Sequence, residues 1–219
     1  QLTVDKNSAK AGEVVLKVTD LTVLDADGRT HVENVSFEVH AGEIVGIAGV
    51  QGNGQTELVE ALTGLRKATG GTISLDGKDL THSDPRERHQ MGMAHIPEDR
   101  QRQGLVGGMS VAENLVLTRY HDDQFSHGVM VDWDSANAIA DTLIGEYDIR
   151  TPNKETGVGT LSGGNQQKVV LPPIHLHHPY PHHLQEKVHL QVLQNLLVLL
   201  QVMAQLHQLQ EMELALVLL

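Results

Sequence analysis

Residues 44–57 read IVGIAGVQGNGQTE, and this stretch decides the fold. Its first six residues, Ile44 to Gly49, form an uninterrupted apolar run, which predicts a fully buried strand. A glycine-rich turn follows, and then a helix is predicted from Gln55 to Leu65, with Leu58, Leu62 and Leu65 on one face. A strand, a glycine-rich loop and a helix, in this order, form the context that a phosphate-binding loop (P-loop) requires.

The spacing of this loop fits the pattern G-x-x-x-x-G-K-[ST] at every position but one. Glycines let successive backbone N–H groups turn toward phosphate oxygens, and the helix N-terminus adds partial positive charge. Thr56 keeps the hydroxyl that would hold Mg²⁺, but Gln55 replaces the lysine that would bring a full charge to the β and γ phosphates. The loop is therefore expected to bind nucleotide weakly and to hydrolyse it poorly; the alternative is an ordinary glycine-rich turn. The nucleotide-binding candidates are Gly49, Gly52, Asn53, Gly54, Gln55, Thr56 and Glu57.

The surrounding segments predict a mixed α/β architecture. Two strands, Val14 to Val18 and a second that carries Val35, Phe37 and Val39, flank an Asp27-Gly28 turn. A further strand is expected over Thr72 to Leu75, before Asp76-Gly77. Ser110 to Glu113 match a capping box that opens a helix toward Tyr120. Another helix is expected from Asp134 to Tyr147, and we expect Trp133 and Tyr147 to anchor this helical part.

A second motif, LSGGNQQK, occupies residues 161–168. A serine, two glycines and a polar helix start offer a hydroxyl, backbone N–H groups and a helix N-terminus to an anion. The alternative is a serine-capped helix with glycines for flexibility. In combination with the P-loop, this motif resembles the signature of the nucleotide-binding domains of ATP-binding-cassette (ABC) transporters. The resemblance implies a signature made of Leu161, Ser162, Gly163, Gly164, Asn165 and Gln166.

Three further blocks narrow the resemblance: residues 92–100, 104–106 and 109–115. Together with the P-loop they look like the second cassette of importers for simple sugars and nucleosides, which typically lacks the P-loop lysine. The likeness covers Val14 to Leu171 and implies a P-loop NTPase cassette with an antiparallel β subdomain and a helical signature subdomain. It also implies ATP and Mg²⁺ as cofactors, and places Glu98 at the Q-loop position, facing magnesium and the transport subunits.

The resemblance implies that two cassettes contribute different parts of one ATP site. The signature of one cassette closes over the ATP bound to the P-loop of the other, so this chain is expected to act mainly in trans. Its partners would be a second cassette and transmembrane permease subunits, at the cytoplasmic face of the cell membrane. No aromatic residue for stacking on adenine occurs in residues 21–28. The alternative function is a non-catalytic regulatory cassette that binds nucleotide and organises the complex.

The composition changes abruptly at residue 172. The last 48 residues hold 14 Leu, 7 Gln and 7 His but no Gly or Asp, whereas all 21 glycines lie before them. We therefore expect a linker over 1–12, an incomplete cassette over 13–171 and an atypical tail over 172–219, which a frame-shifted or mis-assigned coding stretch would explain. One other interpretation of the tail is a metal site at His175, His177, His178, His182 and His183. Another is an oligomerising helix at Leu190, Leu193, Leu197, Leu200 and Ala204, although a simple core-packing or surface-associating helix is preferred for these residues.

Charge and composition exclude several classes of protein. Lys and Arg number 16 against 28 Asp and Glu, so the formal net charge of −12 argues against a cassette that works on DNA or ribosomes through a basic surface. The absence of cysteine excludes disulfides and thiolate sites. The longest apolar run without glycine has six residues, Leu214 to Leu219, far short of the roughly 18 to 20 that span a bilayer. The chain start predicts no signal peptide.

Overall fold

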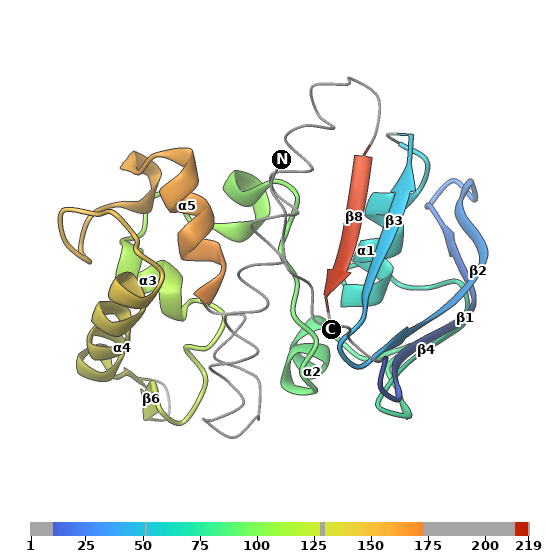
Figure 1. Cartoon of the computed structure of the whole chain (residues 1–219), viewed down its shortest axis with the longest axis horizontal. Helices are drawn as coiled ribbons and strands as arrows, with labels where there is room; N and C mark the ends of the chain where they lie inside the picture. Colours follow the sequence, from blue (N-terminus) through green and yellow to red (C-terminus); the bar gives the residue numbers. More distant parts are fainter. Residues whose placement is uncertain (1–10, 51, 128–129, 173–212, 219) are drawn as a thin grey trace. The chain divides into compact units, whose positions relative to one another are not determined.

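The computed structural model describes residues 11–50, 52–127, 130–172 and 213–218, which divide into two compact units (Figure 1). Unit 1 combines the chain up to Met93 with residues from Glu186 on, and unit 2 spans Ala94–Gln185. Most of the predicted linker, the tail histidines and the tail leucines at heptad spacing lie outside the described residues.

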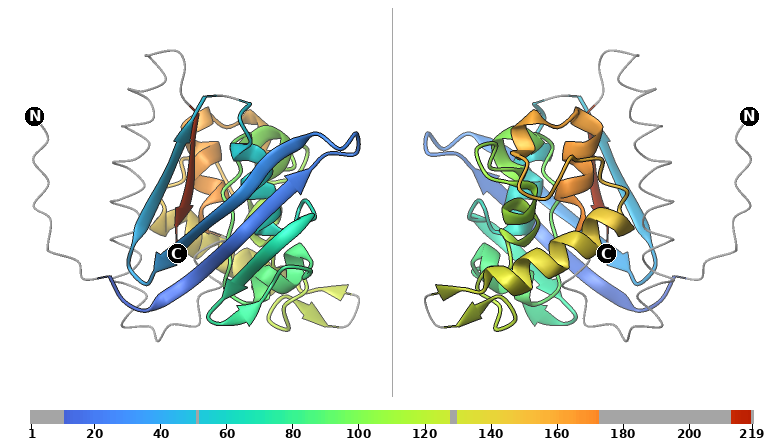
Figure 2. Two further views of the ribbon diagram at one scale, coloured as in Figure 1. Left: turned by 90° about the vertical axis from the view of Figure 1, so that its right-hand side faces the viewer. Right: turned by 90° about the vertical axis from the view of Figure 1, so that its left-hand side faces the viewer.

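Unit 1 contains a four-stranded antiparallel sheet. Its strands are β1 (Val14–Leu24), β2 (Thr30–His40), β4 (Gly70–Leu75) and β5 (Lys78–Asp79), in the spatial order β2-β1-β4-β5 (Figure 2). Val18 of the central strand pairs with Phe37 on one side and with Ile73 on the other. Alternating apolar residues produce this pairing, as the sequence predicted, and the Asp27-Gly28 turn is confirmed, with Gly28 at a φ of +79°.

The strand before the glycine loop forms where it was predicted, but the prediction that it is fully buried was wrong. β3 (Ile44–Gly49) pairs antiparallel with β8 (Glu213–Leu218), from Ile44↔Leu218 to Gly49↔Glu213. Val45 and Ile47 pack against the core of unit 1, whereas Ile44 is 44% exposed. Within the described residues β3 has one partner strand and one covered face, so its side chains alternate between inside and outside.

Helix α1 (Gln55–Thr63) follows the loop and ends two residues before the predicted Leu65. Gly64 terminates it in the left-handed conformation, with a φ of 80°, and its N–H bonds to Ala61 O. Leu58 and Leu62 are buried as predicted. Leu65 is 56% exposed, because it lies beyond the C-cap and leaves the helical face that the leucine spacing implied.

Helix α2 (Pro85–Gln90) begins with a capping box, in which Asp84 and Glu87 bond reciprocally to each other's backbone N–H. Arg88 on this helix carries a charged guanidinium, yet the residue is only 3% exposed. Its guanidinium donates to the carbonyl oxygens of Ala61 and Leu62, both at 2.6 Å, and to that of Leu80 at 2.7 Å. Arg88 thus joins α2 to the C-terminal end of α1. The apolar core around it comprises Leu16, Val18, Leu21, Val23, Val32, Val39, Leu58, Ala61, Leu62, Ile73, Leu75, Leu80 and Met93.

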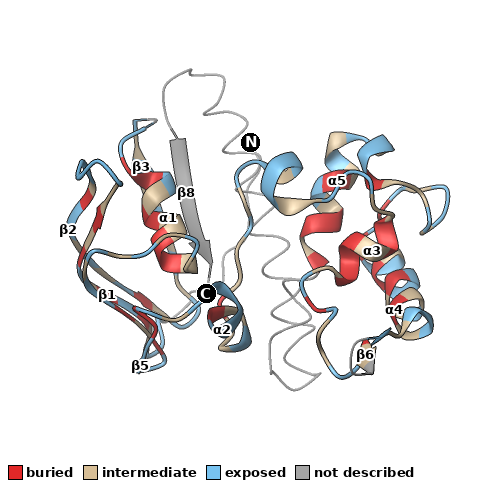
Figure 3. Ribbon diagram, turned by 180° about the vertical axis from the view of Figure 1, so that it is seen from behind, coloured by how far each residue is buried: buried red, intermediate tan, exposed pale blue. Residues whose placement is uncertain are grey.

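Unit 2 is mainly helical. Its elements are a π-helical turn η1 (Arg100–Gly104), α3 (Val111–Val116), β6 (Ser126–His127), β7 (Met130–Val131), α4 (Trp133–Glu146), the 3-10 turn η2 (Val158–Thr160) and α5 (Gly163–Val170). Buried residues lie on α3, α4 and α5 (Figure 3). They are Val111, Ala112, Leu115, Val116, Ala136, Ala140, Leu143, Val169 and Val170, joined by Phe125, Tyr147, Ile149 and Val158 from the loops and from η2.

The capping box predicted at Ser110 and Glu113 is confirmed, with both reciprocal bonds present. The helix that it opens ends at Val116, before the predicted approach to Tyr120. Tyr147 is buried as expected, but Trp133 is 48% exposed, so its predicted anchoring role was wrong. Trp133 is the first residue of α4, where the helix begins on the surface beside its N-cap Asp132. In the described part of the chain, no helix has the length and apolar character needed to cross a membrane.

Candidate functional site

The glycine loop between β3 and α1 exposes backbone donors. Asn53 N–H closes a turn onto Val50 O at 3.2 Å, and Gly52 has a φ of 84°. Gly54 is the N-cap of α1, with a φ of 97° and no side-chain cap. The first N–H groups of α1 therefore have no side-chain cap and can donate to an anion. Gln51 lies outside the described residues.

Two glycines of this loop lie close to neighbouring atoms, and at Gly54 the neighbour is backbone. A Cβ on Gly54 would collide with the backbone carbonyl oxygen of His31, and the positive φ of Gly54 disfavours any L side chain as well. A Cβ on Gly49 would collide with Nε2 of Gln55. Packing thus requires a glycine at position 54, whereas at position 49 a side chain would first displace the end of the Gln55 side chain.

Gln55, at the position of the missing lysine, lies inside the loop. Its side chain crosses Gly49 and is only 6% exposed. Among the described residues, its buried Oε1 has no hydrogen-bond partner. A neutral amide thus takes the place of a cation. The next residue, Thr56, is exposed, which leaves its hydroxyl accessible.

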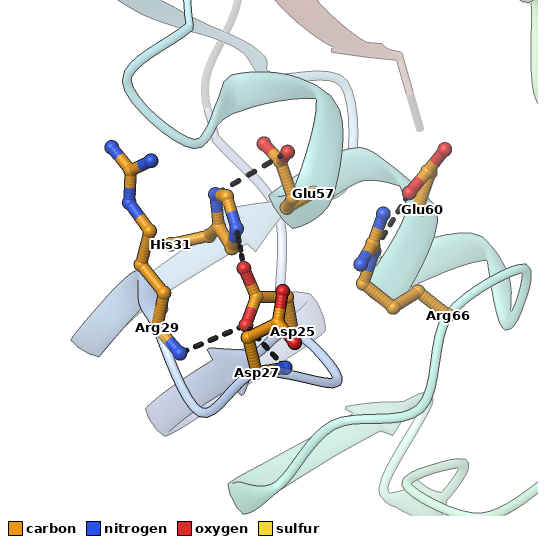
Figure 4. A network of polar contacts seen from close by, with 7 residues as sticks. All are labelled: Asp25, Asp27, Arg29, His31, Glu57, Glu60 and Arg66. Atoms are coloured by element: carbon orange, nitrogen blue, oxygen red, sulfur yellow. Dashed lines mark hydrogen bonds and ion pairs between the residues drawn. The ribbon is translucent and has the colours of Figure 1, made fainter.

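A chain of polar contacts between side chains runs from the first turn of α1 to the β1–β2 turn (Figure 4). Glu57 Oε1 lies 3.4 Å from Nδ1 of His31, and His31 Nε2 lies 3.1 Å from Asp25 Oδ2. Hydrogen bonds from the Arg29 N–H and from His31 lower the pKa of Asp25. Two carboxylates therefore flank His31 beside the loop. Sequence reasoning did not single out His31 on β2, because its two partners come from other segments, the β1–β2 turn and α1.

The residues present fit a phosphate group better than they fit a metal ion. The glycine backbone and the N-terminus of α1 provide donors, and Gly49 and Gly54 leave no room for side chains. Thr56 could supply one hydroxyl to Mg²⁺. Elsewhere in the described residues, no group of three or more His, Asp or Glu could hold a metal ion.

The signature motif forms the start of α5. Ser162 is the N-cap residue, in an extended conformation (φ −60°, ψ 152°), but its side chain makes no cap bond. A serine thus stands at the N-cap position, as the structural alternative expected, but its hydroxyl does not cap the helix. Ser162 and Gly164 are exposed, while Leu161 and Gly163 are half-buried. The hydroxyl and the helix N-terminus both remain accessible to a ligand.

The two amide side chains of the signature bond within unit 2. Asn165 Nδ2 donates to Ser162 Oγ at 3.1 Å, and Asn165 Oδ1 accepts from Arg150 N–H at 3.0 Å. Gln166 is 5% exposed and donates to Val158 O at 3.3 Å. Both residues were predicted as part of the signature, and their hydrogen bonds support its backbone.

Glu98 is exposed and precedes the π-helical turn η1. Asp99 caps this turn, because its Oδ1 accepts from Gln101 N–H at 3.0 Å and from Arg102 N–H at 3.2 Å. Arg100 Nε reaches Gln166 Oε1 at 3.4 Å, which connects the turn to α5. A pocket of about 130 Å³ is lined by Gln101, Leu105, Gly107, Val158, Gly159 and Gln166, and it is smaller than the roughly 300 Å³ of typical ligand pockets.

The candidate residues fall into two groups. Unit 1 holds the phosphate loop, 49–57, and unit 2 holds Glu98 with the signature, 161–166. The antiparallel sheet, the strand–loop–helix segment and the helical signature unit together define a P-loop NTPase of the cassette class. The sequence profile described as "ABC transporter" matches residues 32–180, and the chain belongs to that family. The match ends nine residues beyond Leu171, where we predicted the family pattern to stop.

Several curated proteins are similar to the chain. It is 43% identical over 167 residues to the nucleoside import ATP-binding protein NupA of Lactococcus lactis, covering 76% of the chain and 33% of that protein. The guanosine import ATP-binding protein NupO of Bacillus subtilis is 45% identical over the same shares. The ribose import ATP-binding protein RbsA of Chromobacterium violaceum is 41% identical over 76% of the chain and 32% of that protein. The chain is thus an ABC transporter ATP-binding domain that spans about a third of these relatives.

Solved structures agree on the fold. CbiO1 of Clostridium perfringens, part of the ABC transporter complex cbiONQ, gives a TM-score of 0.58 at 20% identity, covering 76% of this chain and 63% of that one. The ABC transporter cassette MJ0796 gives a TM-score of 0.55 at 18% identity, covering 75% and 70%. The predicted fold class, a P-loop cassette with an antiparallel sheet and a helical part, is confirmed.

Proposed function

We propose that the chain is the second cassette of an importer for nucleosides or simple sugars, with a P-loop that hydrolyses ATP weakly or not at all. The observation that carries the proposal is Gln55, a buried neutral amide where the P-loop pattern has lysine. The lysine normally stabilises the negative charge on the β and γ phosphates. Glu57 adds a carboxylate and is the only ionisable side chain within 49–57. The names of the relatives, which import nucleosides, guanosine and ribose, support the solute class.

In this proposal the loop holds ATP through its backbone. Gly49, Gly52, Asn53, Gly54, Gln55 and Glu57 form the cradle, and the Thr56 hydroxyl is the one Mg²⁺ ligand from this segment. The signature then contributes more to the function than this loop does, by binding the ATP of a second cassette. Ser162, Gly163 and Gly164 lie at the N-terminus of α5, where a hydroxyl and backbone N–H groups can face ATP held by a second cassette. Permease subunits at the cytoplasmic face of the membrane would contact the region of Glu98.

The organisation proposed for the chain is a linker over 1–12, a cassette over 13–171 and an atypical tail over 172–219. A frame shift in the coding stretch would explain the tail, because the composition changes within one residue. Translating the coding DNA in the other frames tests this idea. We expect one of them to continue with an apolar strand that ends in Asp or Glu. An intact native frame that encodes the tail would contradict it.

Titration calorimetry with Mg-ATP tests the function. The chain is measured alone and then mixed with a family cassette that has the P-loop lysine. We expect the chain alone to bind Mg-ATP weakly and the mixture to bind it more tightly. Ser162→Phe should abolish this gain in affinity, because the bulky ring blocks the N-terminus of α5. Thr142→Phe, at an exposed position of α4, is the matched control and should change nothing. Unchanged binding in the Ser162→Phe mixture would contradict the action in trans.

A regulatory cassette that binds nucleotide without turnover is the second candidate, and the buried neutral Gln55 favours it. Phosphate release separates the two functions. In the first, the mixture hydrolyses ATP faster than the partner cassette alone. In the second, ATP binds but the rate stays that of the partner.

A further inference from the structure

A chain of hydrogen bonds fixes the side chain of Asn165 at the start of α5. The backbone N–H of Arg150 donates to Asn165 Oδ1 at 3.0 Å. On its other side, Asn165 Nδ2 lies 3.1 Å from Ser162 Oγ. The amide of Asn165 therefore bridges a loop and the N-cap serine of the signature.

The first of these bonds determines the direction of the second. A backbone N–H can only donate, so the oxygen of the Asn165 amide must face Arg150. The NH₂ group must then face Ser162, and since it can only donate, Ser162 Oγ accepts from it. The proton of the Ser162 hydroxyl has to point elsewhere. Within the described residues, Ser162 makes no side-chain cap bond, and the residue is exposed.

We propose that Asn165 is a positioning residue, which holds the Ser162 hydroxyl as a hydrogen-bond donor toward a phosphate oxygen of ATP on the facing cassette. This inference rests on the proposed function in trans. Asparagine suits the task because it presents a donor and an acceptor on one short side chain, from the third helical position back to the N-cap. Aspartate would still accept from Arg150 N–H, but its second oxygen would take the Ser162 proton for itself.

The segment that orients Asn165 is itself held by α5. Lys168 Nζ donates to the backbone oxygen of Asp148 at 2.6 Å and lies 2.8 Å from its carboxylate. Asp148 precedes Arg150 by two residues, so the far end of α5 secures the loop whose N–H directs Asn165. The orientation of the serine hydroxyl thus follows from a closed ring of contacts between one helix and one loop.

A double-mutant cycle tests the proposal in the full chain. Asn165→Asp, Ser162→Ala and the double variant are mixed with a lysine-bearing family cassette and Mg-ATPγS, and the affinity of the two proteins is measured. Asp in the first turn of a helix is stabilising, so Asn165→Asp should keep its unfolding temperature. We expect each single variant to weaken association by roughly ten- to a hundredfold, the effect of one hydrogen bond to a charged group.

The double variant decides the mechanism. If Asn165 acts through the serine hydroxyl, the double variant is no weaker than Ser162→Ala. If the new carboxylate simply repels phosphate, the loss from Asn165→Asp persists without the hydroxyl, and the proposal is overturned. Asn153→Asp is the control for charge: Asn153 is exposed in the same unit, and its Oδ1 accepts from the Thr156 hydroxyl at 2.7 Å, a bond that Asp keeps. It should leave association unchanged.

A measurement on the isolated chain separates this proposal from the function on which it rests. In a ¹⁵N-labelled sample, Ser162→Ala should move the Asn165 side-chain amide signal and speed its proton exchange with water. An amide that does not respond overturns the positioning of Ser162, whatever the association shows. A responding amide with unaffected association overturns the function in trans and, with it, the phosphate as the acceptor.

Discussion

The guanidinium of Arg100 fills the space into which a side chain at Gly163 would project. Its Nη2 lies 2.7 Å from the position of a Cβ on Gly163, and its Nε bonds to Gln166 Oε1 at 3.4 Å. Gly164, the next residue, has nothing within 4 Å of the corresponding position. Of these two adjacent signature glycines, only Gly163 has a neighbouring side chain at the position that a Cβ would take.

This difference predicts unequal stability effects for alanine at the two positions. Gly164→Ala should raise the free energy of unfolding by about 0.5–1 kcal/mol, because alanine favours the helix and meets open space. Gly163→Ala should gain about 1 kcal/mol less, since Arg100 must move and give up its bond to Gln166. Urea unfolding of both variants measures the difference. Equal gains would contradict the assignment of Arg100.

Substitution of Arg88 should lower the free energy of unfolding more than most other substitutions in unit 1. Arg88→Met removes the donor to Ala61, Leu62 and Leu80 and leaves buried carbonyl oxygens unpaired, so we expect a loss of about 2–4 kcal/mol in unfolding free energy. Arg86→Met on the same helix changes an exposed arginine and should stay within about 0.5 kcal/mol. Thermal and urea unfolding compare the two. Similar losses would mean that the buried hydrogen bonds of Arg88 contribute little.

Gln55→Lys should strengthen the binding of Mg-ATP. A lysine at this position would add a charge-assisted hydrogen bond to phosphate, for roughly a ten- to hundredfold gain in affinity. Gln55→Met has a similar length but adds no charge, and should give no such gain. Calorimetry with the isolated chain measures both. If the two variants bind alike, charge is not what the loop lacks.

The Asp148–Lys168 contact makes stability depend on pH. A hydrogen bond from Lys168 and its charge, with a smaller contribution from Arg150, lower the pKa of Asp148 below its ordinary value of 3.8. A lowered folded-state pKa means that the contact stabilises the fold above that ordinary value and is lost as pH falls through the folded-state pKa. The wild type should therefore exceed Asp148→Asn in stability at pH 7, and this difference should shrink on acidification below pH 4. In a Lys168→Met background the difference at pH 7 should be much smaller.

Local signals in the sequence predicted local structure well. The alternation of Val35, Phe37 and Val39 predicted β2, and the pair Ser110–Glu113 predicted the start of α3. The glycine loop was placed correctly between β3 and α1. Each of these signals acts within a few residues of the structure that it specifies.

Errors arose where burial depends on neighbours that the sequence pattern does not name. The apolar run Ile44–Gly49 predicted a buried strand, but β3 has one covered face. Leu65 matched the helical spacing, yet Gly64 ended the helix first. The roles of His31, Arg88 and Arg100 could not be predicted, because their partners are distant in sequence and no motif records them.

Helix α1 is fastened within unit 1 at both of its ends. His31 holds Glu57 in its first turn, and Arg88 holds the carbonyl oxygens of Ala61 and Leu62 near its last. Because α1 is held at both ends, it cannot rotate about either contact without breaking the other. A force applied at the glycine loop would therefore reach the antiparallel sheet and α2 as a rigid displacement, with little of it absorbed by bending of α1.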